Sequence, residues 1–127
     1  MIECKFNSEG LIPVIAQDYK TGEVLMLAYM DKDALAKTIE CKKMCYYSRS
    51  RKKFWVKGET SGNVQLVKEL FVDCDKDTIV AKVEQVGGAA CHEGYRTCFY
   101  RKISNDGNSL TAIGERVFDP KDVYGDK

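Results

Sequence analysis

The sequence predicts an α+β fold with a mostly antiparallel sheet and one main helix. Two observations near the N-terminus lead to this prediction: a pair of apolar segments separated by a short polar loop, and an aspartate followed by an apolar stripe of helical spacing. In addition, the segments after residue 44 are rich in aromatic and β-branched residues, which are typical of strands. The 127 residues fit one domain, with a core at about residues 10–103 and a polar C-terminal extension at 104–127.

The first two strands are expected at Leu11–Asp18 and Glu23–Met30. Residues 19–22 between them have the composition of a hairpin loop, in which Gly22 can adopt a positive φ. The main helix is expected to begin directly after Asp31. An aspartate at this N-cap position accepts a hydrogen bond from a free backbone amide of the first helical turn.

The remaining strands follow the helix. They are expected at Cys45–Ser48, Phe54–Lys57, Val64–Val72, Thr78–Val86, Phe99–Ile103 and Leu110–Phe118. The last two flank the sequence Asn-Asp-Gly-Asn at residues 105–108, which is a strong hairpin signal. Residues 119–127 are polar and are expected to lie at the periphery.

Composition and charge argue against several classes of function. The 20 Lys and Arg residues nearly balance the 19 Asp and Glu residues, so the net charge gives no indication of a nucleic-acid partner. No apolar run approaches the length of a bilayer span, and the N-terminus does not have the pattern of a signal peptide. We therefore expect a cytoplasmic protein without a membrane or nucleic-acid partner. Its six cysteines are then more typical of metal binding or catalysis than of disulfides.

The segment VDCDKD combines hard oxygen ligands with a soft thiol. If the segment is extended, Asp73, Asp75 and Asp77 share one face and Cys74 points to the other. Clustered carboxylates repel one another unless a cation neutralises them, and oxygen ligands suit Mg²⁺ or Ca²⁺. Taken alone, the segment is more typical of a solvated acidic turn between two strands.

Two further cysteines, Cys91 and Cys98, lie in a glycine-containing segment together with the only histidine, His92. With Cys74 they offer three thiolates, and three protein ligands leave the fourth tetrahedral position of a zinc ion for water, as in catalytic zinc sites. The histidine can exchange a proton near neutral pH, or can close the site as a fourth ligand. The alternative of buried apolar thiols stays open, because free cysteine is among the most buried residues.

A basic and aromatic segment lies between the expected helix and the aspartates. Arginine side chains bind phosphate in a bidentate manner, and backbone amides in a glycine-containing turn can cradle an anion. A tryptophan ring can stack on a base. The alternative is a basic solvated hairpin without a ligand. The candidate substrate-binding residues are Arg49, Arg51, Trp55, Lys57, Gly58, Glu59, Thr60, Ser61 and Gly62.

Together these segments resemble the phosphoribosyl-AMP cyclohydrolase family of histidine biosynthesis. The matching pieces are GEVLMLAYMDKDAL, YYSRSRKKFWVKGETSGNVQ, DCDKD and ACHEGYRTCFYR. They occur in the order typical of the family and span about residues 10–101. The sequence departs from the frequent DCDGD and ACHTG at Lys76 and Glu93, and neither residue replaces a presumed ligand.

The resemblance implies zinc-dependent hydrolytic opening of the adenine ring of N1-(5-phosphoribosyl)-AMP at the N1–C6 bond. The implied product is the formimino aminoimidazole carboxamide ribonucleotide. The resemblance also implies an intertwined homodimer with shared active sites, in which one zinc ion per subunit is held by Cys91, Cys98 and Cys74 of the partner subunit. Magnesium is implied at the three aspartates of VDCDKD. His92 is the candidate for proton transfer.

Two other functions fit parts of the pattern. A zinc-dependent nucleotide deaminase attacks the same purine carbon, but such enzymes use H-x-E with P-C-x-x-C. In this sequence Glu93 directly follows His92, and no C-x-x-C occurs. A non-enzymatic, zinc-stabilised RNA-binding module would saturate its metal with protein ligands. Turnover of the expected nucleotide separates these functions.

Overall fold

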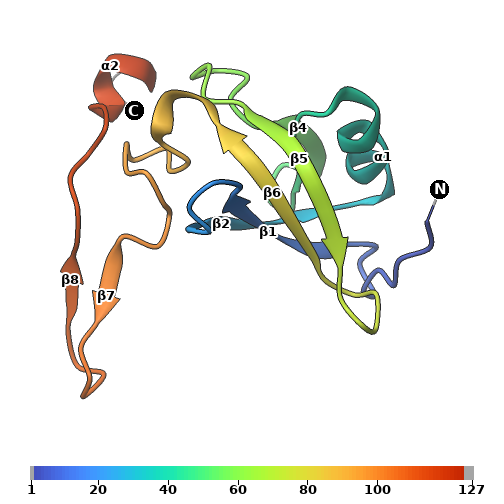
Figure 1. Cartoon of the computed structure of the whole chain (residues 1–127), viewed down its shortest axis with the longest axis horizontal. Coiled ribbons are helices and arrows are strands. Elements are labelled where there is room, and N and C mark those ends of the chain that lie inside the picture. The colour runs from blue at the N-terminus through green and yellow to red at the C-terminus, as the bar shows by residue number, and fades with distance from the viewer. Residues whose placement is uncertain (1, 125–127) are drawn as a thin grey trace.

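The computed structural model describes residues 2–124 and has the predicted α+β architecture (Figure 1). Its centre is a four-stranded sheet in the order β2-β1-β6-β5. These strands are β1 (Ile12–Asp18), β2 (Val24–Met30), β5 (Gln65–Val72) and β6 (Ile79–Gln85). The β1–β2 and β5–β6 pairs are antiparallel, and only the β1–β6 pair of this sheet is parallel. The prediction of a mostly antiparallel sheet with one main helix is confirmed.

The two central strands place every second side chain in the core. On β1, Ile12, Val14 and Ala16 are buried, and on β6 the same holds for Ala81 and Val83. Side chains of a strand alternate between the two faces of its sheet, so this pattern shows that one face is covered by the rest of the chain. The sheet is therefore held by apolar burial along its two middle strands.

Helix α1 (Lys32–Cys41) begins where the sequence predicts. Asp31 Oδ1 accepts a hydrogen bond of 2.8 Å from the Ala34 amide, which is the expected N-cap contact. On the inner face of the helix, the buried Thr38 hydroxyl accepts a hydrogen bond of 2.9 Å from the amide at the start of strand β3 (Cys45–Ser48). The helix is thus joined to the next strand by a polar contact inside the core.

Strands β3 and β4 (Lys53–Val56) form a separate two-stranded hairpin. Tyr46 lies opposite Trp55 across this pair, and their rings are tilted with centroids 5.3 Å apart. Tyr46 is fully buried, whereas Trp55 is only partly covered. The hairpin therefore anchors one aromatic ring in the core and leaves the other accessible at the edge of the molecule.

A chain of buried amide side chains fixes the loop that follows β4. The Tyr46 hydroxyl donates to Gln65 Oε1 at 2.6 Å, and the Gln65 amide donates to Gln85 Oε1 at 2.8 Å. The Gln85 amide then donates to the backbone carbonyl of Asn63 at 2.9 Å. Buried polar groups that are fully paired specify one geometry, so the end of this loop is tied to β5 and β6.

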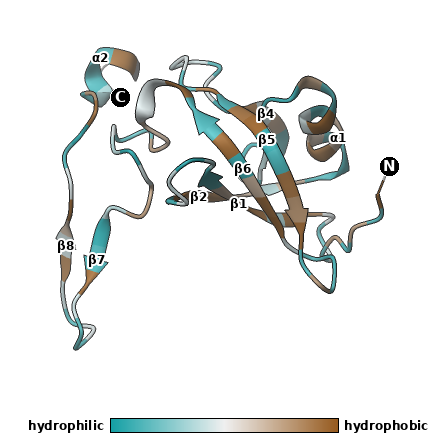
Figure 2. Ribbon diagram, viewed as in Figure 1, coloured by the Kyte–Doolittle hydropathy of each residue, from teal (hydrophilic) through white to brown (hydrophobic). Residues whose placement is uncertain are grey.

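Strands β7 (Arg101–Ile103) and β8 (Leu110–Ala112) form a hairpin that projects away from the main sheet (Figure 1). The prediction of a hairpin turn at residues 105–108 is confirmed. Hydrophobic residues occur along this hairpin (Figure 2), and Ile103 and Leu110 are 64% and 60% exposed. Exposed apolar residues gathered in one place commonly mark an interaction surface.

Two of the predicted strand boundaries are wrong in this region. The strand expected at Phe99–Ile103 begins only at Arg101, and the strand expected at Leu110–Phe118 ends at Ala112. Beyond Ala112 the chain turns at Gly114, which has a φ of 77° and no strand geometry. The short elements η1 (Val86–Gly88) and α2 (Pro120–Tyr124) complete the described chain, and in residues 2–124 no helix has the length and apolarity needed to cross a bilayer.

The N-cap of α1 gives a first testable prediction. Asp31→Ala removes the acceptor of the Ala34 amide, and we expect the free energy of unfolding to fall by about 1 kcal/mol in urea denaturation. Asp33→Ala is the matched control, because this exposed carboxylate lies in the same helical turn and makes no capping bond in the described structure. Asp33→Ala should lower the free energy of unfolding by at most about half as much as Asp31→Ala. Equal losses would show that charge rather than capping stabilises the helix start.

Candidate active site

A cavity of about 490 Å³ lies between strand β2, the β3–β4 hairpin and the segment after β6. Ligand pockets in proteins commonly measure roughly 300–1,000 Å³, so this one is large enough for a nucleotide. The predicted site residues that line it are Arg51, Trp55, Lys57, Gly58, Glu59, Thr60, Ser61, His92 and Cys98.

Two of the predicted substrate-binding residues do not line this cavity. The guanidinium of Arg49 lies 4.3 Å from the ring centroid of Tyr29 on β2, a cation–π arrangement. Gly62 lies at the far end of the turn that follows β4, where its amide donates to the Gly58 carbonyl at 2.7 Å. Gly62 therefore supports the lining residue Gly58 from outside the cavity, whereas Arg49 packs on a residue that does not line it.

The turn at residues 58–62 needs glycine at its first position. Gly58 has a φ of 85°, and a Cβ atom built there would lie 2.4 Å from the backbone of Asn63 and Val64. No other residue fits this conformation and this close approach without displacing the chain. The turn is therefore tight, and it presents Glu59, Thr60 and Ser61 along one side of the cavity.

The segment from Cys91 to Cys98 folds into a closed loop. The Ala90 amide donates to the Arg96 carbonyl at 3.0 Å, and the Cys91 amide donates to the Tyr95 carbonyl at 3.1 Å. These bonds bring the two ends of the segment together. Cys91 is buried, and Cys98 faces the cavity as an exposed residue. Two of the three predicted thiolate ligands are thus neighbours in the folded chain.

The electrostatic environment of these thiols fits a metal centre. Desolvation raises the pKa of Cys98 to about 11, and the nearby Cys91 thiol, to which its side chain is hydrogen-bonded, adds to the rise. The buried Lys57 ammonium acts in the opposite direction and donates a hydrogen bond of 2.5 Å to the Ala90 carbonyl. A thiol with so high a pKa ionises near neutral pH only beside further positive charge, which a bound zinc ion supplies.

Lys57 itself is held in an unusual place for a lysine. Desolvation lowers its pKa, while the thiols of Cys98 and Cys91 act to raise it. The sequence pattern indicated a phosphate contact for this residue but gave no sign that its ammonium lies beside the thiols. That proximity depends on the packing of β4 against the loop, which no local spacing reveals.

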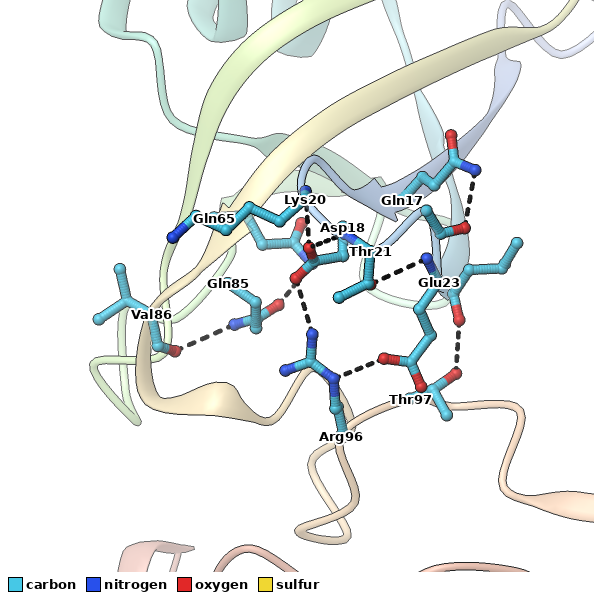
Figure 3. Close-up of polar contacts among 12 residues, drawn as sticks. Gln17, Asp18, Lys20, Thr21, Glu23, Gln65, Gln85, Val86, Arg96 and Thr97 are labelled. Carbon is cyan, nitrogen blue, oxygen red and sulfur yellow. Dashed lines mark hydrogen bonds and ion pairs between the residues drawn. The ribbon is translucent and has the colours of Figure 1, made fainter.

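Arg96 is a residue of the site region that sequence reasoning missed. Its guanidinium bridges two carboxylates of the β1–β2 hairpin, with Nε 2.5 Å from Glu23 Oε1 and a terminal nitrogen 2.7 Å from Asp18 Oδ2 (Figure 3). The hydroxyl of the next residue, Thr97, donates to the Val24 carbonyl at 2.8 Å. The partners are more than 70 residues apart in sequence, so only the fold brings them together.

The aspartates of VDCDKD form a compact carboxylate cluster in an exposed turn between two strands, which is the structure that the composition of the segment favoured. The segment is a turn between β5 and β6 rather than an extended strand, and Lys76 within it has a φ of 65°. The argument from alternating faces is therefore wrong. The turn itself gathers one carboxylate oxygen each from Asp73, Asp75 and Asp77 within 4.8 Å of one another, and all three residues are exposed.

The hydrogen bonding of this cluster shows how the carboxylates share charge. Although desolvation acts to raise it, hydrogen bonds from the Asp77 amide and from neighbouring groups lower the pKa of Asp73. The pKa of Asp77 is raised by hydrogen bonding with Asp75 and with Asp73. Carboxylates so close together compete for a proton, and a divalent cation with oxygen ligands relieves that competition. The donor set therefore fits Mg²⁺.

Strand β6 separates Cys74 from the other two predicted zinc ligands. Cys74 lies in the turn before β6, and the Cys91–Cys98 loop follows its far end (Figure 1). Seven extended residues span about 23 Å at about 3.3 Å each. Within residues 2–124, the aspartate cluster is the only group of three metal-ligating side chains that lie together. One subunit therefore does not bring the three thiols to a common point.

Comparison with known proteins gives the class of this site. A sequence profile of the phosphoribosyl-AMP cyclohydrolase family matches residues 26–100. The chain is 58% identical over 125 residues to a protein of that name from Desulfatibacillum aliphaticivorans, covering 98% of both chains. A protein of the same name from Pelotomaculum thermopropionicum is 58% identical over 121 residues, covering 95% of this chain and 92% of the relative.

A third relative agrees with these two. The protein named phosphoribosyl-AMP cyclohydrolase from Methanosphaera stadtmanae is 54% identical over 118 residues, covering 93% of this chain and 91% of the relative. Together with the cavity, these matches identify the chain as an enzyme of the hydrolase class. More narrowly, it belongs to the phosphoribosyl-AMP cyclohydrolase family.

The turn at residues 58–62 gives a second testable prediction. Both Gly58 and Gly62 have positive φ, but a Cβ atom at Gly62 meets open space whereas one at Gly58 meets the following backbone. We expect Gly62→Ala to lower the free energy of unfolding by about 1 kcal/mol through its φ alone. Gly58→Ala should cost at least about 1 kcal/mol more, because the backbone of Asn63 must move.

Urea denaturation of the two variants makes this comparison. Gly10→Ala is a control for the φ effect, since Gly10 has a φ of 77°, lies away from the cavity and has open space around it. Equal losses of stability in the Gly58 and Gly62 variants would show that the backbone after β4 moves aside for a Cβ atom at little cost.

Proposed function

We propose that the chain catalyses the hydrolytic opening of the adenine ring of N1-(5-phosphoribosyl)-AMP at its N1–C6 bond, a step of L-histidine biosynthesis. The product is the formimino aminoimidazole carboxamide ribonucleotide. The observation that carries this proposal is that three of the four segments shared with the family line one cavity. His92 and Cys98 lie on one side, the Gly58–Ser61 turn lies on the other, and β2 contributes Met26, Leu27 and Ala28. The relatives from Desulfatibacillum aliphaticivorans and Pelotomaculum thermopropionicum bear the name of this activity.

The proposed metal centre uses the thiols of the closed loop. Cys91 and Cys98 of one subunit, with Cys74 of the partner subunit, would hold one zinc ion per subunit. When bound, zinc lowers the pKa of water and so supplies a nucleophile at neutral pH. The proximity of Cys91 to Cys98, and of the Lys57 ammonium to both, supports this assignment. The charge of Lys57 would offset part of the negative charge of three thiolates.

His92 is the proposed proton carrier. It lines the cavity beside Cys98 and is exposed, so water and substrate can reach its ring. In the proposed reaction, the oxygen of water forms a bond to C6, the C6–N1 bond breaks, and this oxygen becomes the carbonyl oxygen of the carboxamide. Of the two protons that water loses, one is delivered to N1 and the other to the exocyclic nitrogen on C6, which becomes the amide NH2. An imidazole accepts and donates protons near neutral pH, which suits both halves of this transfer.

The remaining cavity walls suit a nucleotide with two phosphates. Trp55 is partly exposed and lines the cavity, so its ring face is available for stacking on the purine. Arg51 and the hydroxyls of Thr60 and Ser61 supply phosphate donors on the same lining. Gly62 would act from behind this wall. Mg²⁺ at the aspartate cluster would add the positive charge that the nearly neutral chain lacks.

The proposed assembly is an intertwined homodimer with two shared sites. The length of β6 keeps Cys74 of a subunit away from its own Cys91 and Cys98, so a second copy is needed to complete the ligand set. The projecting β7–β8 hairpin exposes Ile103 and Leu110, which offers apolar surface for such a partner. We further propose that the enzyme acts in the cytoplasm, since its six cysteines are free.

Turnover tests the proposal directly. Purified protein with Zn²⁺ and Mg²⁺ should convert N1-(5-phosphoribosyl)-AMP to the product. The reaction can be followed by the absorbance of that product. Cys91→Ser should lose zinc and lower turnover by more than about 100-fold, since even outer partners of a metal ligand are worth up to about that factor. Cys41→Ser is the control, because this exposed cysteine ends α1 outside the cavity.

Different results would contradict the ligand assignment and the proposed reaction. A zinc-free Cys91→Ser protein with full turnover would contradict the ligand assignment while leaving the reaction in place. Wild-type protein with both metals and no turnover would remove the cyclohydrolase proposal. Release of ammonia from a purine nucleotide would favour a deaminase, and binding of RNA by an inactive protein would favour a binding module.

Complementation tests the shared site. Cys74→Ala and Cys91→Ala should each be inactive, because each damages both sites of its own dimer. After random subunit exchange half of the dimers are mixed, and each mixed dimer has one intact site. We therefore expect recovery of about a quarter of wild-type specific activity. No recovery, with exchange verified by native mass spectrometry of tagged subunits, would indicate that all ligands come from one chain.

A further inference from the structure

The Cys91–Cys98 loop is tied to the sheet by one charged side chain. The Arg96 guanidinium bridges Glu23 and Asp18, at 2.5 Å and 2.7 Å (Figure 3). Asp18 ends strand β1 and Glu23 directly precedes β2, so both carboxylates belong to the same β-hairpin. Arg96 is thus a link between a rigid paired element and a loop without regular secondary structure.

The carboxylate that receives Arg96 is itself fixed. Asp18 is buried, and its second oxygen accepts hydrogen bonds from the amides of Lys20 and Thr21 at 2.9 Å and 3.0 Å. The backbone of Asp18 also pairs with Glu23 at 2.8 Å. Because both the side chain and the backbone of Asp18 are hydrogen-bonded, its carboxylate has little conformational freedom and can hold the Arg96 guanidinium in one place.

The backbone of the same residue closes the loop. The Arg96 carbonyl accepts the Ala90 amide at 3.0 Å, directly before Cys91, and two residues further on the Cys98 amide donates to the Leu25 carbonyl at 2.7 Å. The side chain of Arg96 therefore holds the residue whose carbonyl closes the loop beside Cys91. Cys98 lies two residues further on and contacts β2 through its own amide, so Arg96 fixes the loop between its two cysteines.

We propose that Arg96 is a positioning residue that holds the two thiols of the Cys91–Cys98 loop in their ligand arrangement before any metal binds. The inference rests on the proposed function, since it gives these thiols their task. Groups that support ligands from outside commonly decide how well a metal is held, because an oriented ligand set need not be ordered at the moment of binding. Arg96 touches neither substrate nor reacting atoms in this role.

A positioning role differs from a general contribution to stability. Arg96 and Glu23 are each 38% exposed, and ion pairs at such positions contribute little to global unfolding. Asp18 is only 11% exposed, but its carboxylate keeps the hydrogen bonds from the Lys20 and Thr21 amides when Arg96 is replaced. Loss of the link should therefore loosen the loop while the sheet stays folded. If Arg96 served only overall stability, its removal would instead lower the melting temperature and leave the loop no more mobile than the rest of the chain.

The experiment compares Arg96→Met with Arg96→Lys and with a matched control. Lys68→Met is that control, because it removes an ion pair of 3.6 Å with Glu84 on the β5–β6 sheet, away from the cavity. Glu23→Gln is a milder second variant that keeps Arg96 itself. Measured quantities are amide hydrogen exchange at residues 90–98 in metal-free protein, the rate of zinc release to a chromogenic chelator, kcat and KM.

For Arg96→Met we expect exchange at residues 90–98 to be about 10-fold faster or more, with the melting temperature nearly unchanged. Zinc release should be roughly 10- to 100-fold faster and kcat correspondingly lower, with KM within about threefold of wild type, because the phosphate-binding turn is untouched. For Arg96→Lys and Glu23→Gln, the rates of exchange and zinc release and the value of kcat should lie between those of wild type and Arg96→Met. Lys68→Met should match wild type in all of them.

Unchanged exchange in both Arg96→Met and Glu23→Gln would overturn the inference, as would faster exchange spread evenly over the sheet. If wild-type protein held no zinc, the proposed metal centre would fail on its own. In that case faster exchange confined to residues 90–98 in the Arg96→Met protein would still support the positioning role.

Discussion

Strand β6 runs extended between β1 and β5, and this constraint decides where the chemistry of the protein lies. Its pairing on both sides and the burial of Ile79, Ala81 and Val83 fix it as a straight spacer in the middle of the core. The carboxylate turn precedes it, and the cysteine loop follows it. Because the two groups sit at opposite ends of one strand, Cys74 and the carboxylates of the turn are kept apart from Cys91 and Cys98 within one chain.

At the cysteine end, burial and charge act against each other. Desolvation favours the neutral Cys98 thiol and the neutral Lys57 amine, whereas the charge interaction between these two side chains favours their charged forms. Desolvation has the larger effect, since the pKa of Cys98 is raised and the pKa of Lys57 is lowered. Placing such groups on a short loop requires that the loop be held firmly, and the contacts with β2 and with the β1–β2 hairpin do this.

Much of the fold could be predicted because local rules and tertiary packing agree. The alternation along β1 and the cap at Asp31 are signals within a few residues, and both are found in the structure. The segment after Ala112 has strand-like composition, yet in the described structure its residues are not assigned to a strand and the chain turns at Gly114. Composition reports what a segment favours, but pairing decides whether a strand forms.

The candidate site was predictable in its ingredients rather than in its geometry. Residue types and the family pattern indicated the three cysteines, the three aspartates and His92. The composition of VDCDKD indicated an acidic turn, but the positive φ of Lys76 and the clustering of the three carboxylate oxygens could not be predicted from it. The link from Arg96 to Asp18, like the place of Lys57 beside the thiols, joins segments far apart in sequence and has no local signal.

The order of elements along the chain also bears on how the protein is made. The projecting β7–β8 hairpin follows β6 in sequence, so a ribosome releases its apolar residues only after all strands of the main sheet have emerged. Aggregation-prone surface is therefore delivered to a chain whose core can already have formed. If the hairpin preceded the sheet in sequence, its apolar residues would be exposed while the strands of the sheet were still unpaired. Unpaired strand edges are surfaces prone to misassociation during synthesis.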